Sequence, residues 1–207
     1  MAQRRIITIG RMFGSGGHDI GKLLAEKLDF GFYDKELLAL AAKESGLAPE
    51  VLESNDERPT SSLLYTLSMG THGIIPGTDA MPLGHQVFLA QFEAIRKLAQ
   101  KGNCVIVGRC ADYALRGVPG VTNVFIHAPL EYRLGRVQRQ FGISETEARD
   151  RIAKTDKKRA AYHNSYSDHK WGALETYHLS VDSSVLGTEG TEELIRRFLE
   201  LQIQKEV

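Results

Sequence analysis

The sequence lacks several features that would place a protein in a particular class. Its 207 residues carry 26 Lys and Arg against 26 Asp and Glu, so there is no net charge to attract nucleic acid or an anionic membrane. No apolar run approaches the length that crosses a bilayer, and the first residues lack the apolar segment of a secretion signal. We therefore expect a cytoplasmic protein with no nucleic-acid and no membrane partner. The oligomeric state stays open.

Cysteine is scarce as well. The two cysteines, Cys104 and Cys110, lack the spacing of metal ligands. Cys104 opens an apolar run at 104–107, and we predict that both are reduced thiols. With 207 residues, of which 42% are hydrophobic, the chain fits a single domain over 1–207 better than two independent ones.

Short apolar runs alternate with segments of helical periodicity. The runs that we interpret as strands lie at 6–9, 30–33, 104–107, 121–127 and 177–181. This alternation predicts an α/β fold of three layers, in which helices cover both faces of a parallel sheet of about five strands. Residues 45–83 interrupt the order with glycines and prolines, and we interpret them as an insert with a short helix at 63–67.

A glycine-rich turn follows the first predicted strand. It leads into a helix and contains, in order, Gly14, Ser15, Gly16, Gly17, His18 and Asp19. Glycines let backbone N–H groups point inward with no side chain in the way, and the helix N-terminus adds positive partial charge. The turn therefore predicts a cradle for the phosphates of a nucleotide, with a plain tight turn as the alternative.

The turn has no lysine at the position where a P-loop has one. Gly21 and Lys22 match part of the P-loop pattern, but they fall inside the periodic helix, where Lys22 is expected to face solvent. Phosphoryl transfer still needs a cation near the β- and γ-phosphates, and Arg11 is the nearest candidate, with His18 second. We predict that Asp19, or alternatively Ser15, holds Mg²⁺, although Asp19 also suits an ordinary helix N-terminus.

Polar residues follow three further predicted strands. Asp34 ends the second, where its carboxylate can orient an acceptor, bind a metal or cap the next helix. Arg109 follows the third and offers a planar fork suited to phosphate, with Asp112 placed to pair with it or with the metal. Asp182 follows the fifth, where it borders the nucleotide base or serves only as a turn residue. Because parallel strands end at one edge of a sheet, we expect these residues to lie near the glycine turn.

Residues 133–170 are rich in positive charge, with ten Lys or Arg residues against five Asp or Glu. A solvated helix face is the usual explanation of such a run, but the excess of one sign also suits an anionic ligand. We interpret residues 142–171 as a mobile basic lid that closes over transferring phosphates.

Together these segments resemble the cytidylate kinase-like family, a branch of the P-loop nucleoside monophosphate kinases. The resemblance covers nearly the whole chain and rests on residues 14–17 with 20–22, 32–37, 105–112 and 156–159. It implies that Arg109 contacts the acceptor phosphate. The cations implied to contact the transferring phosphates are Arg133, Arg136, Lys157 and Arg159. The chain departs from the cytidylate kinases proper at Gly17, which replaces the lysine, and at 107–110, which keeps the arginine without the acids.

The resemblance implies transfer of the γ-phosphoryl group of ATP, with Mg²⁺, to a nucleoside monophosphate, CMP or dCMP being favoured. Three alternatives stay open: a kinase for another small acceptor, a non-catalytic nucleotide sensor, and a Rossmann dinucleotide enzyme in which Asp34 binds a ribose. The last is disfavoured because Asp19 stands where the G-x-G-x-x-G motif needs its final glycine.

Overall fold

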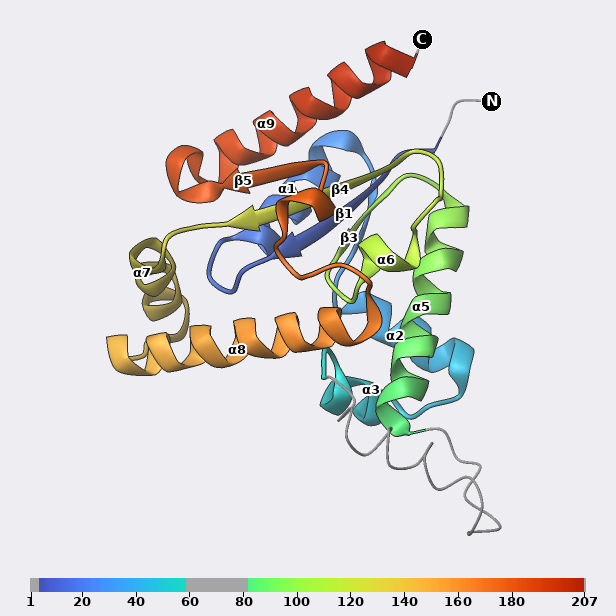
Figure 1. Cartoon of the computed structure of the whole chain (residues 1–207), viewed down its shortest axis with the longest axis horizontal. Coiled ribbons are helices and arrows are strands. Elements are labelled where there is room, and N and C mark those ends of the chain that lie inside the picture. The colour runs from blue at the N-terminus through green and yellow to red at the C-terminus, as the bar shows by residue number, and fades with distance from the viewer. Residues whose placement is uncertain (1–3, 59–81, 207) are drawn as a thin grey trace.

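The computed structural model describes residues 4–58 and 82–206 and has one parallel sheet at its centre (Figure 1). The strands are β1 (Ile6–Arg11), β2 (Gly31–Tyr33), β3 (Cys104–Val107), β4 (Val121–His127) and β5 (Leu179–Asp182). All neighbouring pairs run parallel. Each strand coincides with a predicted apolar run, so the expected sheet of about five parallel strands is confirmed.

The order of the strands is β2-β3-β1-β4-β5. In a Rossmann fold the first two strands are neighbours, whereas here β3 lies between β1 and β2. The alternative of a Rossmann dinucleotide enzyme is therefore wrong. The order also places the ends of β1 and β3 side by side, with Ile9 opposite Val107.

Helices cover both faces of the sheet, as the three-layer prediction requires. The helices of the described residues are α1 (Gly17–Leu28), α2 (Glu36–Ser45), α3 (Pro49–Asn55), α5 (Leu83–Lys101), α6 (Ala111–Ala114), α7 (Leu130–Phe141), α8 (Glu145–Tyr166) and α9 (Ser183–Glu206), with a short 3₁₀ helix at Leu174–Thr176. Successive residues of β1 point to opposite faces, so Ile7 and Ile9 meet α1 and α9, while Ile6 meets α2, α5 and α6. α9 bends at Gly187.

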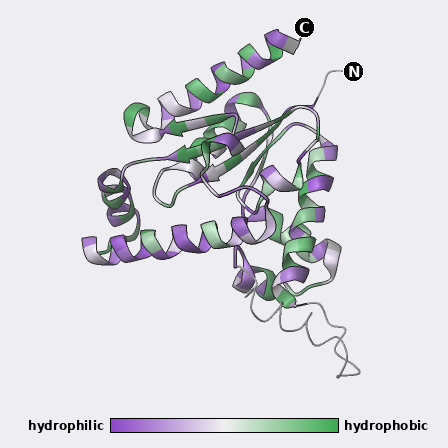
Figure 2. Ribbon diagram, viewed as in Figure 1, coloured by the Kyte–Doolittle hydropathy of each residue, from purple (hydrophilic) through white to green (hydrophobic). Residues whose placement is uncertain are grey.

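α7 and α8 follow the carboxyl end of β4 and lie apart from the two helical layers (Figure 1). Ser144 and Glu147 form a capping box at the start of α8, as the sequence indicates. Apolar contacts anchor α8 to α7 at its start and to α5 at its end. Figure 2 shows that α8 is hydrophilic along most of its length, in contrast to the strands. The predicted lid at 142–171 thus consists mainly of one helix.

The insert predicted at 45–83 is described only in part. Its described residues contain α3, which packs against α2 and α5. The short helix predicted at 63–67 lies outside the described residues, so the bounds of the insert stay a prediction. Within the described ranges, no helix is long and apolar enough to cross a membrane.

Candidate functional site

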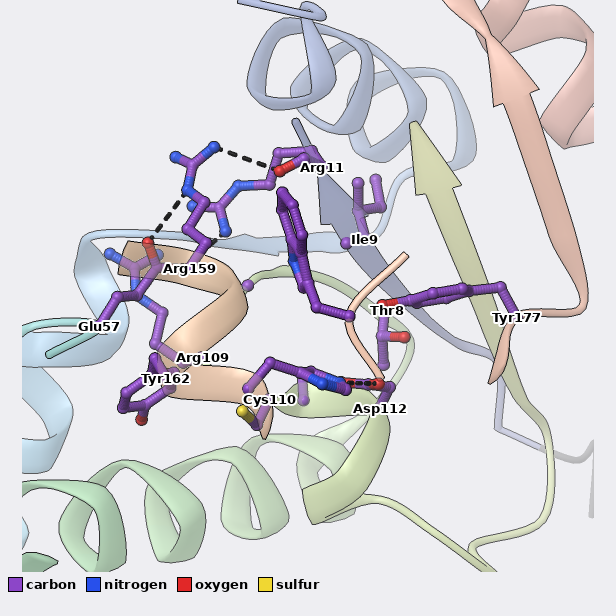
Figure 3. Close-up of a pocket in the computed structure, with 15 residues that line it drawn as sticks. Thr8, Ile9, Arg11, Glu57, Arg109, Cys110, Asp112, Arg159, Tyr162 and Tyr177 are labelled. Atoms are coloured by element: carbon purple, nitrogen blue, oxygen red, sulfur yellow. Dashed lines mark hydrogen bonds and ion pairs between the residues drawn. The ribbon is translucent and has the colours of Figure 1, made fainter. Parts of the chain in front are cut away.

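The carboxyl edge of the sheet gathers cations from three separate elements. Arg11 ends β1, Arg109 follows β3, and Arg159 comes from α8. Figure 3 shows the three side chains around one small cavity, whose volume is about 20 Å³. A space of this size holds about one water molecule, so a substrate can enter only if side chains move.

The glycine turn lies against α7. Gly14 and Gly16 have φ angles of 81° and 85°, a region that favours glycine. A Cβ atom at Gly16 would lie 3.3 Å from the guanidinium of Arg136, and one at Gly14 would lie 3.1 Å from Cβ of Arg133. The glycines therefore allow both predicted arginines of α7 to approach the turn.

Carboxylates hold both predicted arginines of α7. Arg136 donates to Asp19 at 2.7 Å, and Arg133 donates to Asp156 of α8 at 2.5 Å. The other oxygen of Asp156 accepts from the backbone N–H of Phe13 at 2.7 Å. These contacts tie the glycine turn, α7 and α8 together.

Asp19 and Ser15 differ in their fitness to hold Mg²⁺. Ser15 is only 1% exposed, and its hydroxyl group is directed at the carbonyl oxygens of Met12 and Ile126. Asp19 is exposed at the start of α1. Mg²⁺ in phosphoryl-transfer sites uses one or two carboxylates together with the phosphates of the substrate. The described residues contain no group of three or more metal-ligating side chains, and a single carboxylate at Asp19 fits that kind of site. The geometry does not favour Ser15.

The side chain of Arg11 occupies the space beside Gly17. A Cβ atom at Gly17 would lie 2.6 Å from Cβ and 3.0 Å from Cγ of Arg11, well inside the usual separation of carbon atoms. A side chain at position 17 and the stem of Arg11 therefore exclude each other. This is a steric reason why Arg11 and a lysine at position 17 do not occur together here.

A left-handed turn positions Arg109. Gly108, Arg109 and Cys110 have φ angles of 76°, 51° and 54°, an unusual conformation for the two residues that are not glycine. The Arg109 guanidinium donates to Asp34, and to both carboxylate oxygens of Asp56 at 3.1 and 2.8 Å. Burial alone would lower the pKa of Arg109, but the surrounding carboxylates raise it above its ordinary value. Arg109 is therefore a buried, fully charged cation.

Asp34 contacts Arg109 and does not cap α2. The N-cap of α2 is Lys35, and that helix has no side-chain cap among the described residues. The carboxylate accepts from Arg109 and lies 2.6 Å from Nδ1 of His18. Burial would raise the pKa of Asp34, but the charges of Arg109 and Arg11 hold it below its ordinary value. The capping alternative for Asp34 is wrong because a distant arginine binds the carboxylate instead.

Asp56 and Glu57 complete the cluster, and sequence reasoning missed both. They follow α3, and the two oxygens of Glu57 accept from Arg11 at 2.7 Å and from Arg159 at 3.2 Å (Figure 3). Burial would raise the pKa of Glu57, but Arg11 and Arg159 hold it well below its ordinary value. Two adjacent acids in an irregular segment were the available signal, and only the fold shows that they face arginines.

Two of the predicted cations of α8 have different surroundings. Arg159 also donates to the carbonyl oxygen of Arg11 at 3.2 Å, while burial and the charge of Arg11 lower the pKa of Arg159 to about 10. Lys157 is exposed and takes no part in these contacts within the described residues. The structure thus brings Arg159, but not Lys157, into the cluster.

Asp112 and Asp182 have hydrogen-bond partners other than arginine. Asp112 lies on the far side of the same cavity, and its carboxylate accepts from Nε2 of His163 at 2.8 Å. Asp182 accepts from the backbone N–H and the hydroxyl group of Ser184, which is the turn role considered from the sequence. The predicted pair of Asp112 with Arg109 is not formed.

The sequence matches the model of the cytidylate kinase-like family over residues 6–185. The chain belongs to the cytidylate kinase-like family. Cytidylate kinases of Methanococcus aeolicus and Pyrococcus horikoshii are each 26% identical to it, over 93% and 92% of this chain and 96% and 86% of their own lengths. The cytidylate kinase of Ignicoccus hospitalis is 31% identical, over 49% of this chain and 58% of its own length.

Solved structures show the same fold. An uncharacterized protein from Eubacterium ventriosum superposes with a TM-score of 0.71 at 29% identity, covering 95% of this chain and 99% of that one. A shikimate kinase from Bacteroides thetaiotaomicron superposes with a TM-score of 0.53 at 17% identity, covering 95% of this chain and 98% of that one. A gluconokinase from Sinorhizobium meliloti superposes with a TM-score of 0.51 at 16% identity, covering 100% of both chains. The last two show the fold alone. This member of the cytidylate kinase-like family therefore has the fold of a P-loop kinase.

The crowding between Arg11 and Gly17 can be tested by Gly17→Ala. Because the added methyl group meets carbon atoms of a buried stem, we expect a loss of about 1–3 kcal/mol in the free energy of unfolding, measured in urea. Gly102→Ala is the matched control, because Gly102 has extended backbone and open space around its Cβ position. It should change stability by less than about 0.5 kcal/mol. Equal losses in the two variants would contradict the crowding.

The buried carboxylates predict how stability depends on pH. Asp34 and Glu57 have folded pKa values below their ordinary values of 3.8 and 4.5, so their ionised forms stabilise the fold at neutral pH. That contribution should disappear as the pH falls from about 5 through the folded pKa values. The double variant Asp34→Asn/Glu57→Gln, unfolded in urea over the same pH range, should lose less stability than the wild type. If the free energies of unfolding of the wild type and the double variant fall in parallel with pH, these carboxylates are not a source of acid sensitivity.

Proposed function

We propose that this protein transfers the γ-phosphoryl group of ATP to a nucleoside monophosphate, CMP or dCMP, in a reaction that requires Mg²⁺. The observation that carries the proposal is the gathering of arginines at the carboxyl edge of the sheet. Arg133 and Arg136 of α7 and Arg11 of β1 lie beside the glycine turn at the N-terminus of α1. Arg109 and Arg159 join Arg11 in one cluster next to it. Membership of the cytidylate kinase-like family supports it, as do the names of the related cytidylate kinases.

The proposed reaction needs positioning and positive charge, and no covalent intermediate. An oxygen of the acceptor phosphate attacks the γ-phosphorus, the bond to the β–γ bridging oxygen breaks, and ADP leaves with the electron pair. The N–H groups of residues 14–17 would hold the ATP phosphates. Arg11, Arg133 and Arg136 would stabilise charge that develops on the donor, and Arg109 would bind the acceptor phosphate.

The remaining predicted residues would complete the site. Asp34 and Asp112 would orient the acceptor, and Asp182 would border the base of ATP. Lys157 and Arg159 would approach the transferring group from α8. Mg²⁺, when bound, would neutralise part of the phosphate charge, and Asp19 would supply a carboxylate to hold it.

A coupled assay of ADP release tests the proposal directly. The purified protein is assayed with ATP and Mg²⁺ against a panel of nucleoside monophosphates and small alcohols, and we expect turnover with CMP or dCMP to exceed the rest. Turnover with a different acceptor would assign the protein to another small-molecule kinase. ATP binding without any turnover would refute the proposed kinase activity and favour the alternative of a non-catalytic nucleotide sensor. The absence of a lysine at position 17 also allows that alternative.

Arg11 can be tested as the substitute for the missing lysine. We expect Arg11→Ala to lower kcat by roughly 10²–10³-fold, because it removes a cation that acts on the developing charge. Arg11→Lys keeps the charge and should recover part of the rate. Arg149→Ala, which removes an exposed arginine of α8, is the control and should leave kcat unchanged. An unchanged kcat in Arg11→Ala would exclude Arg11 from the mechanism.

A further inference from the structure

Carboxylates balance the cations at the site one for one. Arg11, Arg109 and Arg159 meet three acids, which are Asp34, Asp56 and Glu57. Within the described residues, this group of six side chains therefore carries no net charge. A phosphate group would meet three guanidiniums whose donors already bind carboxylates. A site built only to attract phosphate has no need of the two acids that follow α3.

Glu57 has the placement of a bound anion. Its oxygens accept from Arg11 at 2.7 Å and from Arg159 at 3.2 Å, so a single carboxylate bridges β1 and α8. A phosphate group bridges two guanidiniums through the same kind of charge-assisted hydrogen bond. It also carries up to two negative charges where Glu57 carries one. Phosphate is thus a chemically matched and stronger occupant of the same place.

The backbone at Glu57 is compatible with release. Its φ angle is 50°, in the left-handed region that residues other than glycine seldom adopt. Glu57 directly follows the C-cap of α3, and its side chain forms ion pairs with Arg11 and Arg159. Such strained positions persist only where surrounding contacts impose them. If the guanidiniums took another anion, these ion pairs would be gone.

We propose that Glu57 is an internal stand-in for a substrate phosphate, bound between Arg11 and Arg159, and that a phosphate group of the substrate displaces it. Exchange of one anion for another would open the cavity, which now has room for about one water molecule. It would also break the ion pair that ties Glu57, after α3, to Arg159 of α8 each time substrate binds. The inference deepens the proposed function, because it takes the phosphate of that function as the ligand, but it does not depend on catalysis.

The test is the affinity for inorganic pyrophosphate, measured by calorimetry on the full chain. If Glu57 competes with the ligand, Glu57→Gln removes the competitor's charge and lowers the Kd, and we expect a change of about tenfold, equivalent to about 1.4 kcal/mol. If Glu57 only positions Arg11 and Arg159, the same variant raises the Kd. The two roles therefore predict changes of opposite sign.

Glu53→Gln is the matched control, because it removes the same charge from an exposed position one turn earlier on α3. It should leave the Kd for pyrophosphate unchanged. A Kd that is unchanged or raised in Glu57→Gln, or a fall of equal size in both variants, would overturn the inference. The absence of pyrophosphate binding to both the wild type and Glu57→Gln would overturn it as well.

Hydrogen exchange on the wild-type protein gives a second measurement, which holds even if Glu57→Gln does not fold. The amides of Asp56 and Arg58 donate to the carbonyl oxygens of Glu53 and Asn55. Displacement of Glu57 should speed exchange at these amides when pyrophosphate is bound, whereas unchanged or slower exchange would contradict it. Neither readout uses turnover. If the protein is an active kinase but hydrogen exchange slows when pyrophosphate binds, only the displacement of Glu57 is refuted. If the protein is inactive but hydrogen exchange speeds up, only the proposed kinase activity is refuted.

Discussion

Cations buried at the carboxyl edge of the sheet are tolerated only because carboxylates lie between them. Arg11 and Arg159 come from β1 and α8, and each would repel the other without the carboxylate of Glu57. Arg109 is buried in the same way against two acids. Buried ion pairs of this kind add little stability over apolar packing, but removing one partner leaves an uncompensated charge and is costly. The cluster that connects β1, the turn after β3 and α8 is therefore sensitive to any change in charge, including the binding of another anion.

Local signals in the sequence predicted the frame of the molecule. The apolar runs identified all five strands, and the capping box identified the start of α8, because each depends on neighbouring residues. The partners of the charged residues were harder to predict, because Asp34 and Arg109 are 75 residues apart and Arg11 and Glu57 are 46 apart. Asp34 does not form the local contact considered for it, a helix cap, because its carboxylate binds the distant Arg109. Charge pairing over these separations depends on packing that one sequence does not display.

α8 constrains what can move at this edge. Tyr166 stacks on Phe88 with ring centroids 3.8 Å apart, and Tyr162 donates to Gln91 at 2.8 Å, so these aromatic side chains anchor the end of the helix on α5. Displacing α8 as a rigid lid would break apolar contacts at both ends. The release of Glu57 proposed above would break its ion pairs with Arg11 and Arg159, and an incoming phosphate would remake them. The least costly opening of the cavity is therefore on the side of α3.

The absent P-loop lysine then has a physical counterpart in the strand before the turn. Arg11 fills the space that a side chain at Gly17 would need, so a cation can be supplied from one position or the other but not from both. The two cations are not equivalent. A lysine at the start of a helix is a point charge, whereas Arg11 offers a planar fork that stays charged when buried and can bridge two oxygens. That fork binds Glu57, and under the proposed displacement its charge would become fully available to a nucleotide when the carboxylate leaves. If Arg11 takes the place of the lysine as proposed, phosphate binding at the glycine turn would be linked to Glu57 after α3, a link that a lysine at position 17 would not need.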